Sequence, residues 1–169
     1  GLPPMKPVTT AYTLSVGTPE DMAEAAAKAA HRPLLKVKLA GPGDDERMAA
    51  VRANAPVSTL IVDANEAWDE SCFEANMAAC QAAEVALIEQ PLPAGKDQLL
   101  ADMERPVPVC ADESLHTRKD LQDLRSRYDA VNIKLDKAGG LTESLAMAQI
   151  AKELDFKIME TVTWIAVLI

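Results

Sequence analysis

Short apolar runs recur along this chain at a steady interval, and a charged residue stands at the end of five of them. The intervals between the charged residues are 25, 26, 23 and 22 residues, counted along the series Lys38, Asp63, Glu89, Asp112 and Lys134. Each interval accommodates one strand, one helix and two loops, which is the length of a parallel crossover unit. Such a unit, when repeated, brings the five charged side chains together at one edge of a sheet.

The apolar runs are short and rich in Val, Ile, Leu and Thr, as buried parallel strands are. They predict strands at 9–16, 34–39, 59–62, 85–88, 107–111, 130–135 and 156–159. Helical patterns lie between them, at 18–30, 44–54, 69–83, 97–104, 117–127 and 142–154. The first helix has a clear start, because Thr18 is a good N-cap and Pro19 fits the first helical turn. The alternation of strand and helix predicts an α/β protein.

Two α/β architectures fit this alternation, an open doubly wound sheet and a closed (β/α) barrel. The chain has no G-x-G-x-x-G after its first strand and no P-loop, so the nucleotide-binding open sheets lose support. Charged residues at the ends of five successive strands favour the barrel, because all barrel strands end at one mouth. A typical barrel needs about 250 residues. We therefore expect residues 1–169 to form a single, incomplete TIM-type barrel domain.

The composition narrows the class of protein and of partner. The chain is 49% hydrophobic and 25% charged, as soluble globular proteins are, and its net charge of -9 argues against a nucleic-acid partner. No apolar run reaches the ~18–20 residues that span a bilayer, and residues 1–7 lack the pattern of a signal peptide. We expect a cytoplasmic protein with no membrane partner. The three cysteines show no C-x-x-C spacing, which indicates neither a disulfide framework nor a zinc site.

The five charged residues are the candidate site. Three convergent carboxylates suit a hard divalent cation, and a lysine at each end of the series suits proton transfer beside it. Lys36 joins them, because alternation along a strand places it on the same face as Lys38. For any single acid, a cap on the following helix is an equally good explanation. Three acids in succession, followed by Lys134, favour a shared site, and Mg²⁺ would offset their mutual repulsion.

Five motifs surround these residues: KVK (36–38), DAN (63–65), IEQPLP (88–93), ADES (111–114) and NIKLDKAGGLTE (132–143). Together they resemble the signatures of the enolase superfamily, and most closely those of its dipeptide epimerases, the L-Ala-D/L-Glu epimerase group. The resemblance spans roughly residues 9–159. It implies the barrel domain of that superfamily, without the N-terminal capping domain that family members carry.

The resemblance also implies roles for individual residues. Asp63, Glu89 and Asp112 would bind Mg²⁺, and Lys38 and Lys134 would be acid/base residues on opposite faces of the substrate. Three further residues would support them: Lys36 in substrate binding, and Asn65 and Glu113 beside the ligands and lysines.

This assignment makes chemical sense. A proton next to a carboxylate is too weakly acidic for an unaided amine, and Mg²⁺ on the carboxylate oxygens would stabilise the enediolate that proton removal leaves. Positive charge from the metal and from Lys36 is expected to lower the pKa values of the catalytic lysines. Two lysines on opposite faces imply 1,1-proton transfer, hence epimerisation of a dipeptide such as L-Ala-D/L-Glu in the recycling of peptidoglycan peptides.

Two alternatives stay open. The first is a muconate cycloisomerase or an o-succinylbenzoate synthase of the same superfamily, which can use the same lysines and metal ligands. The second is an inert fragment that assembles with itself or with another chain. Without a capping domain we expect low or no activity from the chain alone, and we expect a partner chain or another copy to cover the open edges of the barrel.

Overall fold

The computed structural model describes residues 9–162 and 165–168 of the 169-residue chain. The prediction about residues 1–7 lies outside them. In this part of the chain eight strands form one sheet in sequence order. They are β1 (Tyr12–Leu14), β2 (Leu34–Lys38), β3 (Thr59–Asp63), β4 (Val85–Glu89), β5 (Val109–Ala111), β6 (Ala130–Lys134), β7 (Lys157–Val162) and β8 (Ile165–Leu168). The first seven are parallel to their neighbours, and β8 returns antiparallel to β7.

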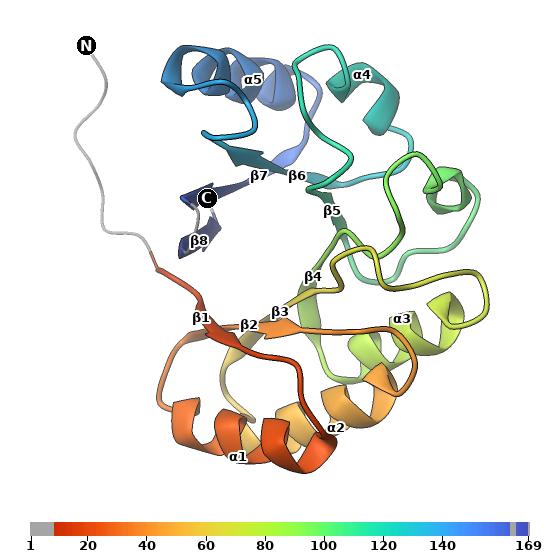
Figure 1. Ribbon diagram of the computed structural model, residues 1–169, viewed down its shortest axis with the longest axis vertical. Helices are drawn as coiled ribbons and strands as arrows, with labels where there is room; N and C mark the ends of the chain where they lie inside the picture. The colour runs from red at the N-terminus through yellow and green to blue at the C-terminus, as the bar shows by residue number, and fades with distance from the viewer. Residues whose placement is uncertain (1–8, 163–164, 169) are drawn as a thin grey trace.

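Helices connect the parallel strands and cover one side of the sheet. They are α1 (Pro19–Ala29), α2 (Asp44–Asn54), α3 (Phe73–Ala82), the 3₁₀ helix η1 (Gln98–Ala101), α4 (Leu121–Leu124) and α5 (Leu141–Glu153). Figure 1 shows the sheet curled into an arc with the helices along its outer side, open between β1 and β8. The predicted fold class, an incomplete TIM-type barrel, is confirmed. In the described ranges no helix is both long and apolar enough to cross a bilayer.

Three predicted helices are shorter than the sequence pattern indicated, and in each case an aspartate side chain explains the difference. The helix predicted at 69–83 begins only at Phe73, because Asp69 Oδ1 accepts hydrogen bonds from the backbone and hydroxyl of Ser71 and holds a turn there. The helix predicted at 117–127 is the single turn α4, because Asp120 Oδ2 instead accepts the amide protons of His116 and Thr117.

The helix predicted at 97–104 is also wrong, since only the 3₁₀ turn η1 forms there. The reason is the side chain of Asp97. Instead of capping this helix, it points into the protein interior and accepts hydrogen bonds from Ser114 and Tyr128. By contrast, the predicted start of α1 is confirmed, because Thr18 Oγ1 accepts a hydrogen bond from the backbone of Asp21.

The two faces of the sheet bury different sets of side chains. The large apolar cluster fills the space between the sheet and the outer helices. A second, smaller cluster lies on the opposite, concave face, with one residue from each of six successive strands: Leu34, Ile61, Leu87, Cys110, Ala130 and Met159. We call this layer of six residues the apolar floor. It lies beneath the side chains that come two residues later on the same face of each strand.

Asp44 joins the loops that follow β2 and β3. Its buried carboxylate accepts hydrogen bonds from the amides of Ala40 and Gly41, at 3.0 and 2.7 Å, and from the indole of Trp68, at 2.9 Å. Arg47 forms an ion pair with it at 3.0 Å. Gly41 and Trp68 are buried, so their N–H groups depend on this carboxylate for a hydrogen bond.

We predict that Asp44→Ala lowers the free energy of unfolding by about 3 kcal/mol, because the buried donors lose their shared acceptor. Urea denaturation followed by circular dichroism measures this loss. Asp45→Ala is the matched control, since Asp45 is the next residue of the same helix but is exposed. Its cost should stay within about 0.5 kcal/mol. Equal losses for the two variants would contradict the prediction.

Candidate active site

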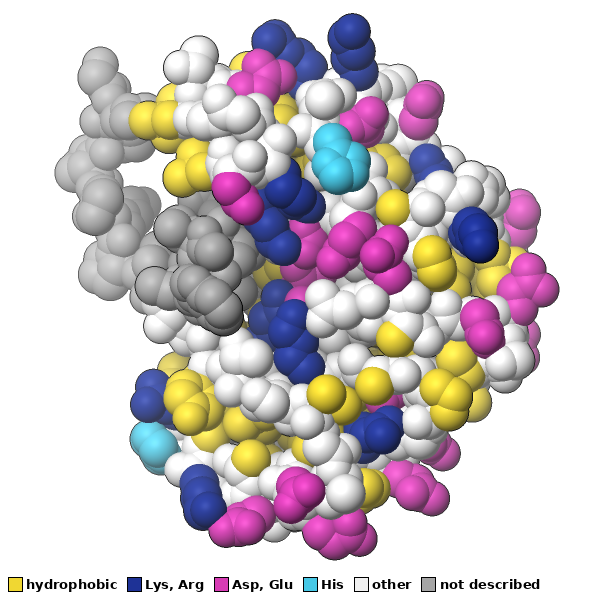
Figure 2. Space-filling model, viewed as in Figure 1, with side chains coloured by type: hydrophobic (Ala, Val, Ile, Leu, Met, Phe, Trp, Pro, Cys, Tyr) yellow, Lys and Arg dark blue, Asp and Glu magenta, His cyan; other side chains and the backbone are white. Residues whose placement is uncertain are grey.

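The charged residues form the layer above the apolar floor. Along each strand, every second residue faces the concave side, so Lys36 follows Leu34 and Asp63 follows Ile61. The same rule brings Glu89, Asp112 and Asn132 into the layer, one from each of the next three strands. Lys38 and Lys134 lie one further step toward the open end of the sheet. Figure 2 shows basic and acidic side chains together at the centre of the face in view.

Each of the three acids forms an ion pair with at least one lysine. The buried Lys36 Nζ lies 2.8 Å from Asp63 Oδ2 and also bonds Glu89 Oε2. Lys38 Nζ lies 2.7 Å from the same Asp63 oxygen and 2.7 Å from Asn65 Oδ1. Lys134 Nζ pairs with Asp112 Oδ2. The structure thus brings together the residues that the sequence selected.

Glu113 lies at the edge of this group. Its carboxyl is half-buried, and its Oε2 has no hydrogen-bond partner in the described part of the chain. Burial, followed by the negative charge of Asp112, raises the pKa of Glu113. The side chain of Glu113 is therefore close enough for the charge of Asp112 to raise its pKa, but it forms no ion pair with the described residues of the site.

Two residues of the cluster were not identified from the sequence. Asn132 Nδ2 donates to Glu89 Oε1 at 2.6 Å, and its own Oδ1 is buried without a partner among the described residues. Strand alternation back from Lys134 would have found it. Lys137 bonds both the side chain and the main-chain oxygen of Asp112. It comes from the loop after β6, where no periodicity predicts side-chain direction.

Burial and like charge control the ionisation of the acids. Burial, together with the nearby charge of Asp63, raises the pKa of Glu89 to about 7. Burial also favours the neutral forms of Asp63 and Asp112, but the adjacent lysines outweigh it and lower the pKa of both. The central acid, Glu89, is therefore the one of the three whose pKa is raised, and burial is the main cause.

The pKa of Lys134 is shifted in the direction opposite to the sequence-based expectation. Burial lowers the pKa of Lys36 and Lys134, but the neighbouring carboxylates more than offset it, and both pKa values are raised. The expectation assumed a cation that would take up the carboxylate charge. Here the lysines themselves balance that charge, so their protonated forms are stabilised.

The donor set fits Mg²⁺ in the chemistry of its oxygens, although these oxygens bond lysine ammonium groups in this structure. No group of three or more His, Cys, Asp or Glu side chains in the described ranges is gathered closely enough to hold a metal ion. The ammonium groups of Lys36 and Lys134 bond the same acids instead. Three carboxylates at or just beyond the ends of adjacent strands nevertheless supply the hard oxygen ligands that Mg²⁺ prefers.

The histidines and cysteines are not part of the charged cluster. His31 and His116 are exposed, as the sequence indicated. Cys110 belongs to the apolar floor, and burial raises its thiol pKa well above the usual value. Cys80 is buried as well, whereas Cys72 is only half-buried.

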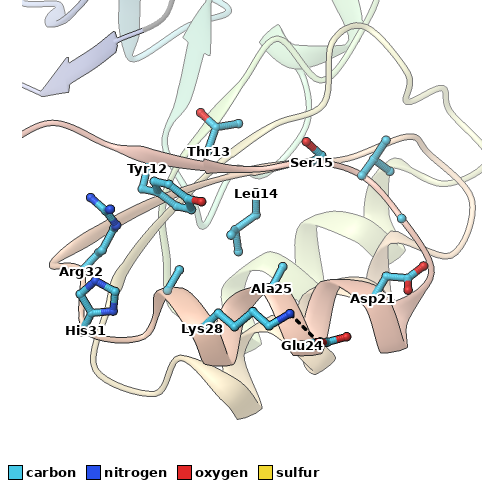
Figure 3. A pocket seen from close by; sticks show the side chains of 13 residues that line it. Tyr12, Thr13, Leu14, Ser15, Asp21, Glu24, Ala25, Lys28, His31 and Arg32 are labelled. Carbon is cyan, nitrogen blue, oxygen red and sulfur yellow. Dashed lines mark hydrogen bonds and ion pairs between the residues drawn. The ribbon is translucent and has the colours of Figure 1, made fainter.

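A pocket of about 480 Å³ lies away from the charged cluster, between β1 and α1 (Figure 3). None of the residues that the sequence selected lines it. Its charged side chains are already engaged: Lys28 pairs with Glu24 at 2.5 Å, and the Arg32 guanidinium stacks 4.4 Å from the centre of the Tyr12 ring. The strand-end acids and lysines therefore lie outside this pocket.

Comparison with known proteins agrees with the geometry. An L-Ala-D/L-Glu epimerase from Escherichia coli K12 is 49% identical over 154 residues, which are 90% of this chain and 48% of that protein. An N-acetyl-D-glutamate racemase from a Pseudoalteromonas species is 50% identical over 149 residues, covering 88% of this chain and 47% of its own length. This chain thus spans about half the length of these relatives.

A solved structure from Agrobacterium tumefaciens superposes with a TM-score of 0.87 at 50% identity, covering 92% of this chain and 48% of that one. It is an enolase family member with homology to dipeptide epimerases, with sodium and L-Ala-L-Glu bound. Residues 20–167 also match the family described as Enolase C-terminal domain-like. The strand-end acids and lysines, the curled parallel sheet and these matches lead to one conclusion: the chain belongs to the Enolase C-terminal domain-like family.

Proposed function

We propose that this chain carries the catalytic centre of a Mg²⁺-dependent epimerase that acts by proton transfer between two lysines. The observation that carries the proposal is the order of side chains along the sheet. Lys38 stands at the end of β2 and Lys134 at the end of β6, with the three acids at or just beyond the ends of β3, β4 and β5 between them. A substrate held over the acids would therefore have one lysine on each side.

Asp63, Glu89 and Asp112 are the residues that would hold the cation. When bound, Mg²⁺ supplies positive charge beside the substrate carboxylate, where negative charge develops as the α-proton leaves. Lys36 adds a buried positive charge to the same place, since its ammonium lies between Asp63 and Glu89. The apolar floor beneath excludes water from this side and strengthens these interactions.

The lysines move the proton. Lys38 Nζ is held by Asp63 and Asn65, and Lys134 Nζ by Asp112, so each amine has a fixed position on its side of the site. One neutral amine removes the α-proton and the other ammonium returns a proton to the opposite face, which inverts the configuration. Glu113 and Lys137 stand beside this path and adjust its charge.

The substrate we propose is a dipeptide such as L-Ala-D/L-Glu. The E. coli relative is named for alanyl-glutamate, and the Pseudoalteromonas relative for N-acetyl-glutamate. Both compounds are glutamates whose amino group is acylated, which leaves the α-carboxylate free to lie over the cation. The shared chemistry supports an N-acylated glutamate at the reacting position.

Proton exchange tests the proposal. In D₂O with Mg²⁺, the glutamate Cα proton of L-Ala-L-Glu should exchange for deuterium in the presence of the chain, as followed by ¹H NMR. With one lysine serving each face, Lys38→Ala and Lys134→Ala should each slow epimerisation at least about 100-fold. Each should retain exchange only for the epimer whose proton faces the surviving lysine.

Lys28→Ala is the control for these variants. Lys28 is an exposed lysine of α1 that pairs with Glu24 and lines the pocket between β1 and α1, outside the charged cluster. This variant should leave exchange unchanged. Absence of exchange from both epimers, in a chain that binds Mg²⁺, would contradict the epimerase proposal and favour an inert fragment.

Cation binding makes a separate prediction about stability. At a Mg²⁺ concentration 100 times the Kd, the free energy of unfolding should rise by about 2.7 kcal/mol, because only the folded chain presents the ligands. Chelation with EDTA should reverse the rise. Thermal or urea unfolding with and without Mg²⁺ measures it.

Glu89→Gln should abolish this Mg²⁺-dependent gain, because it removes a ligand while keeping the shape of the side chain. Glu84→Gln is the matched control, since Glu84 is an exposed glutamate just before the opposite end of β4. It should keep the whole gain. A gain that survives in Glu89→Gln would assign the cation to another place on the molecule.

A further inference from the structure

A buried polar cluster lies directly beside the charged site. Gln90, Asp97 and Tyr128 are each 0% exposed, and Ser114 is half-buried between them. Their side chains hydrogen-bond one another although they come from three connecting segments: Gln90 and Asp97 follow β4, Ser114 follows β5, and Tyr128 follows α4. Fully buried polar side chains need such partners, so the cluster holds a defined arrangement.

The side-chain amide of Gln90 can have only one orientation. Its Oε1 accepts the backbone amide protons of Asp112 and Ser114, at 2.8 and 3.1 Å. A backbone N–H can only donate, so the atom facing it must be the carbonyl oxygen. The amide nitrogen of Gln90 therefore faces the other side of the cluster.

The direction of the remaining bonds follows. Gln90 Nε2 carries two protons and has three acceptors within reach: Leu92 O at 2.8 Å, and Ser114 Oγ and Tyr128 Oη at 2.9 Å each. The Leu92 carbonyl takes one proton, so the two hydroxyls share the other. Both hydroxyls in turn donate to Asp97 Oδ2, at 2.6 Å from Ser114 and 2.7 Å from Tyr128.

Asp97 is the fixed end of this chain of hydrogen bonds. Arg127 pairs with its other oxygen, Oδ1, which holds the carboxylate in place. Burial, with the charge of Asp97, raises the pKa of Tyr128, so its hydroxyl stays a donor. Asp97 thus accepts the protons of both hydroxyls, and these hydroxyls face the amide nitrogen of Gln90.

The backbone of Gln90 is constrained as well. It has a φ of 35°, which is uncommon for a residue other than glycine. Its amide donates to Cys110 O at 2.9 Å, and its carbonyl accepts from Glu66 at 2.8 Å, so both neighbouring strand ends hold it. Strained backbone that the surroundings hold this firmly is typical of functional sites.

Gln90 lies between two of the acids proposed to bind the cation. Gln90 follows Glu89 directly in sequence, and its side chain holds the amide of Asp112 on the next strand. One side chain therefore links two of the three acids that would bind the cation. Movement of Gln90 would change the separation of Glu89 and Asp112.

We propose that Gln90 is a positioning residue that fixes Glu89 and Asp112 for cation binding, and that Asp97 holds Gln90 in place through Ser114 and Tyr128. The inference rests on the proposed function, because the spacing of these acids matters only where they share a ligand. It concerns no contact with substrate.

Two conservative variants test it. Tyr128→Phe removes only the hydroxyl, and Gln90→Glu keeps the acceptor for Asp112 but places an oxygen against the carbonyl of Leu92. We expect each to weaken Mg²⁺ binding about tenfold in isothermal titration calorimetry. We also expect the amides of Asp112 and Ser114 to exchange with solvent about tenfold faster in NMR hydrogen exchange.

Ser58→Ala is the control for a purely structural effect. Ser58 is buried just before β3, at the end of the strand opposite Asp63, and its hydroxyl donates to Arg32 O at 2.9 Å. This variant should lose stability but keep the Mg²⁺ affinity and the Asp112 exchange rate of the unsubstituted chain.

The two measurements separate the positioning role from the proposed function. If the unsubstituted chain binds no Mg²⁺, the proposed function is contradicted, and the exchange rate of the Asp112 amide still decides whether Gln90 positions it. Unchanged exchange in both Tyr128→Phe and Gln90→Glu would overturn the positioning role. Equal weakening of Mg²⁺ binding by Ser58→Ala would overturn it too, because stability alone would then explain the effect.

Discussion

Negative charge that has been brought together and buried must be balanced, and this requirement organises the centre of the molecule. Glu89 is 1% exposed and lies between Asp63 and Asp112 on adjacent strands. Without positive charge the three carboxylates would repel one another and lose their hydration. Lys36 is buried beside these carboxylates, although an isolated lysine is rarely buried. Each of these charges is stable only because the others are present.

The alternation of side chains along each strand explains why the charged residues gather in one layer. The concave face carries apolar residues in one layer and charged residues in the next, because each strand contributes every second side chain. The apolar layer has a low dielectric, which strengthens the interactions above it. A shift of one residue in any strand would turn its charged side chain into the apolar cluster on the helix side. The register of the sheet is therefore coupled to the chemistry of its mouth.

The sequence predicted what depends on periodicity and failed where tertiary contacts decide. Strand ends at Asp63, Glu89 and Lys134 followed from short apolar runs, and the shared face of Lys36 and Lys38 from alternation. The helix at 97–104 failed because Asp97, a good cap by local rules, bonds Tyr128 instead, 31 residues away. Lys137 was missed for the same reason. Its partner Asp112 is reached from a loop, where no period indicates direction.

The raised pKa values of Lys36 and Lys134 reveal what binding of a cation would change. In this structure the ammonium groups balance the carboxylates, and that role requires them to keep their protons. A base must give up that proton before it can accept another. Under the proposed function, Asp63, Glu89 and Asp112 would hold a cation that would balance their charge in place of the lysines, which would weaken the attraction that keeps the proton on Lys134. The acids proposed to bind the metal would then also control whether Lys134 can act as a base.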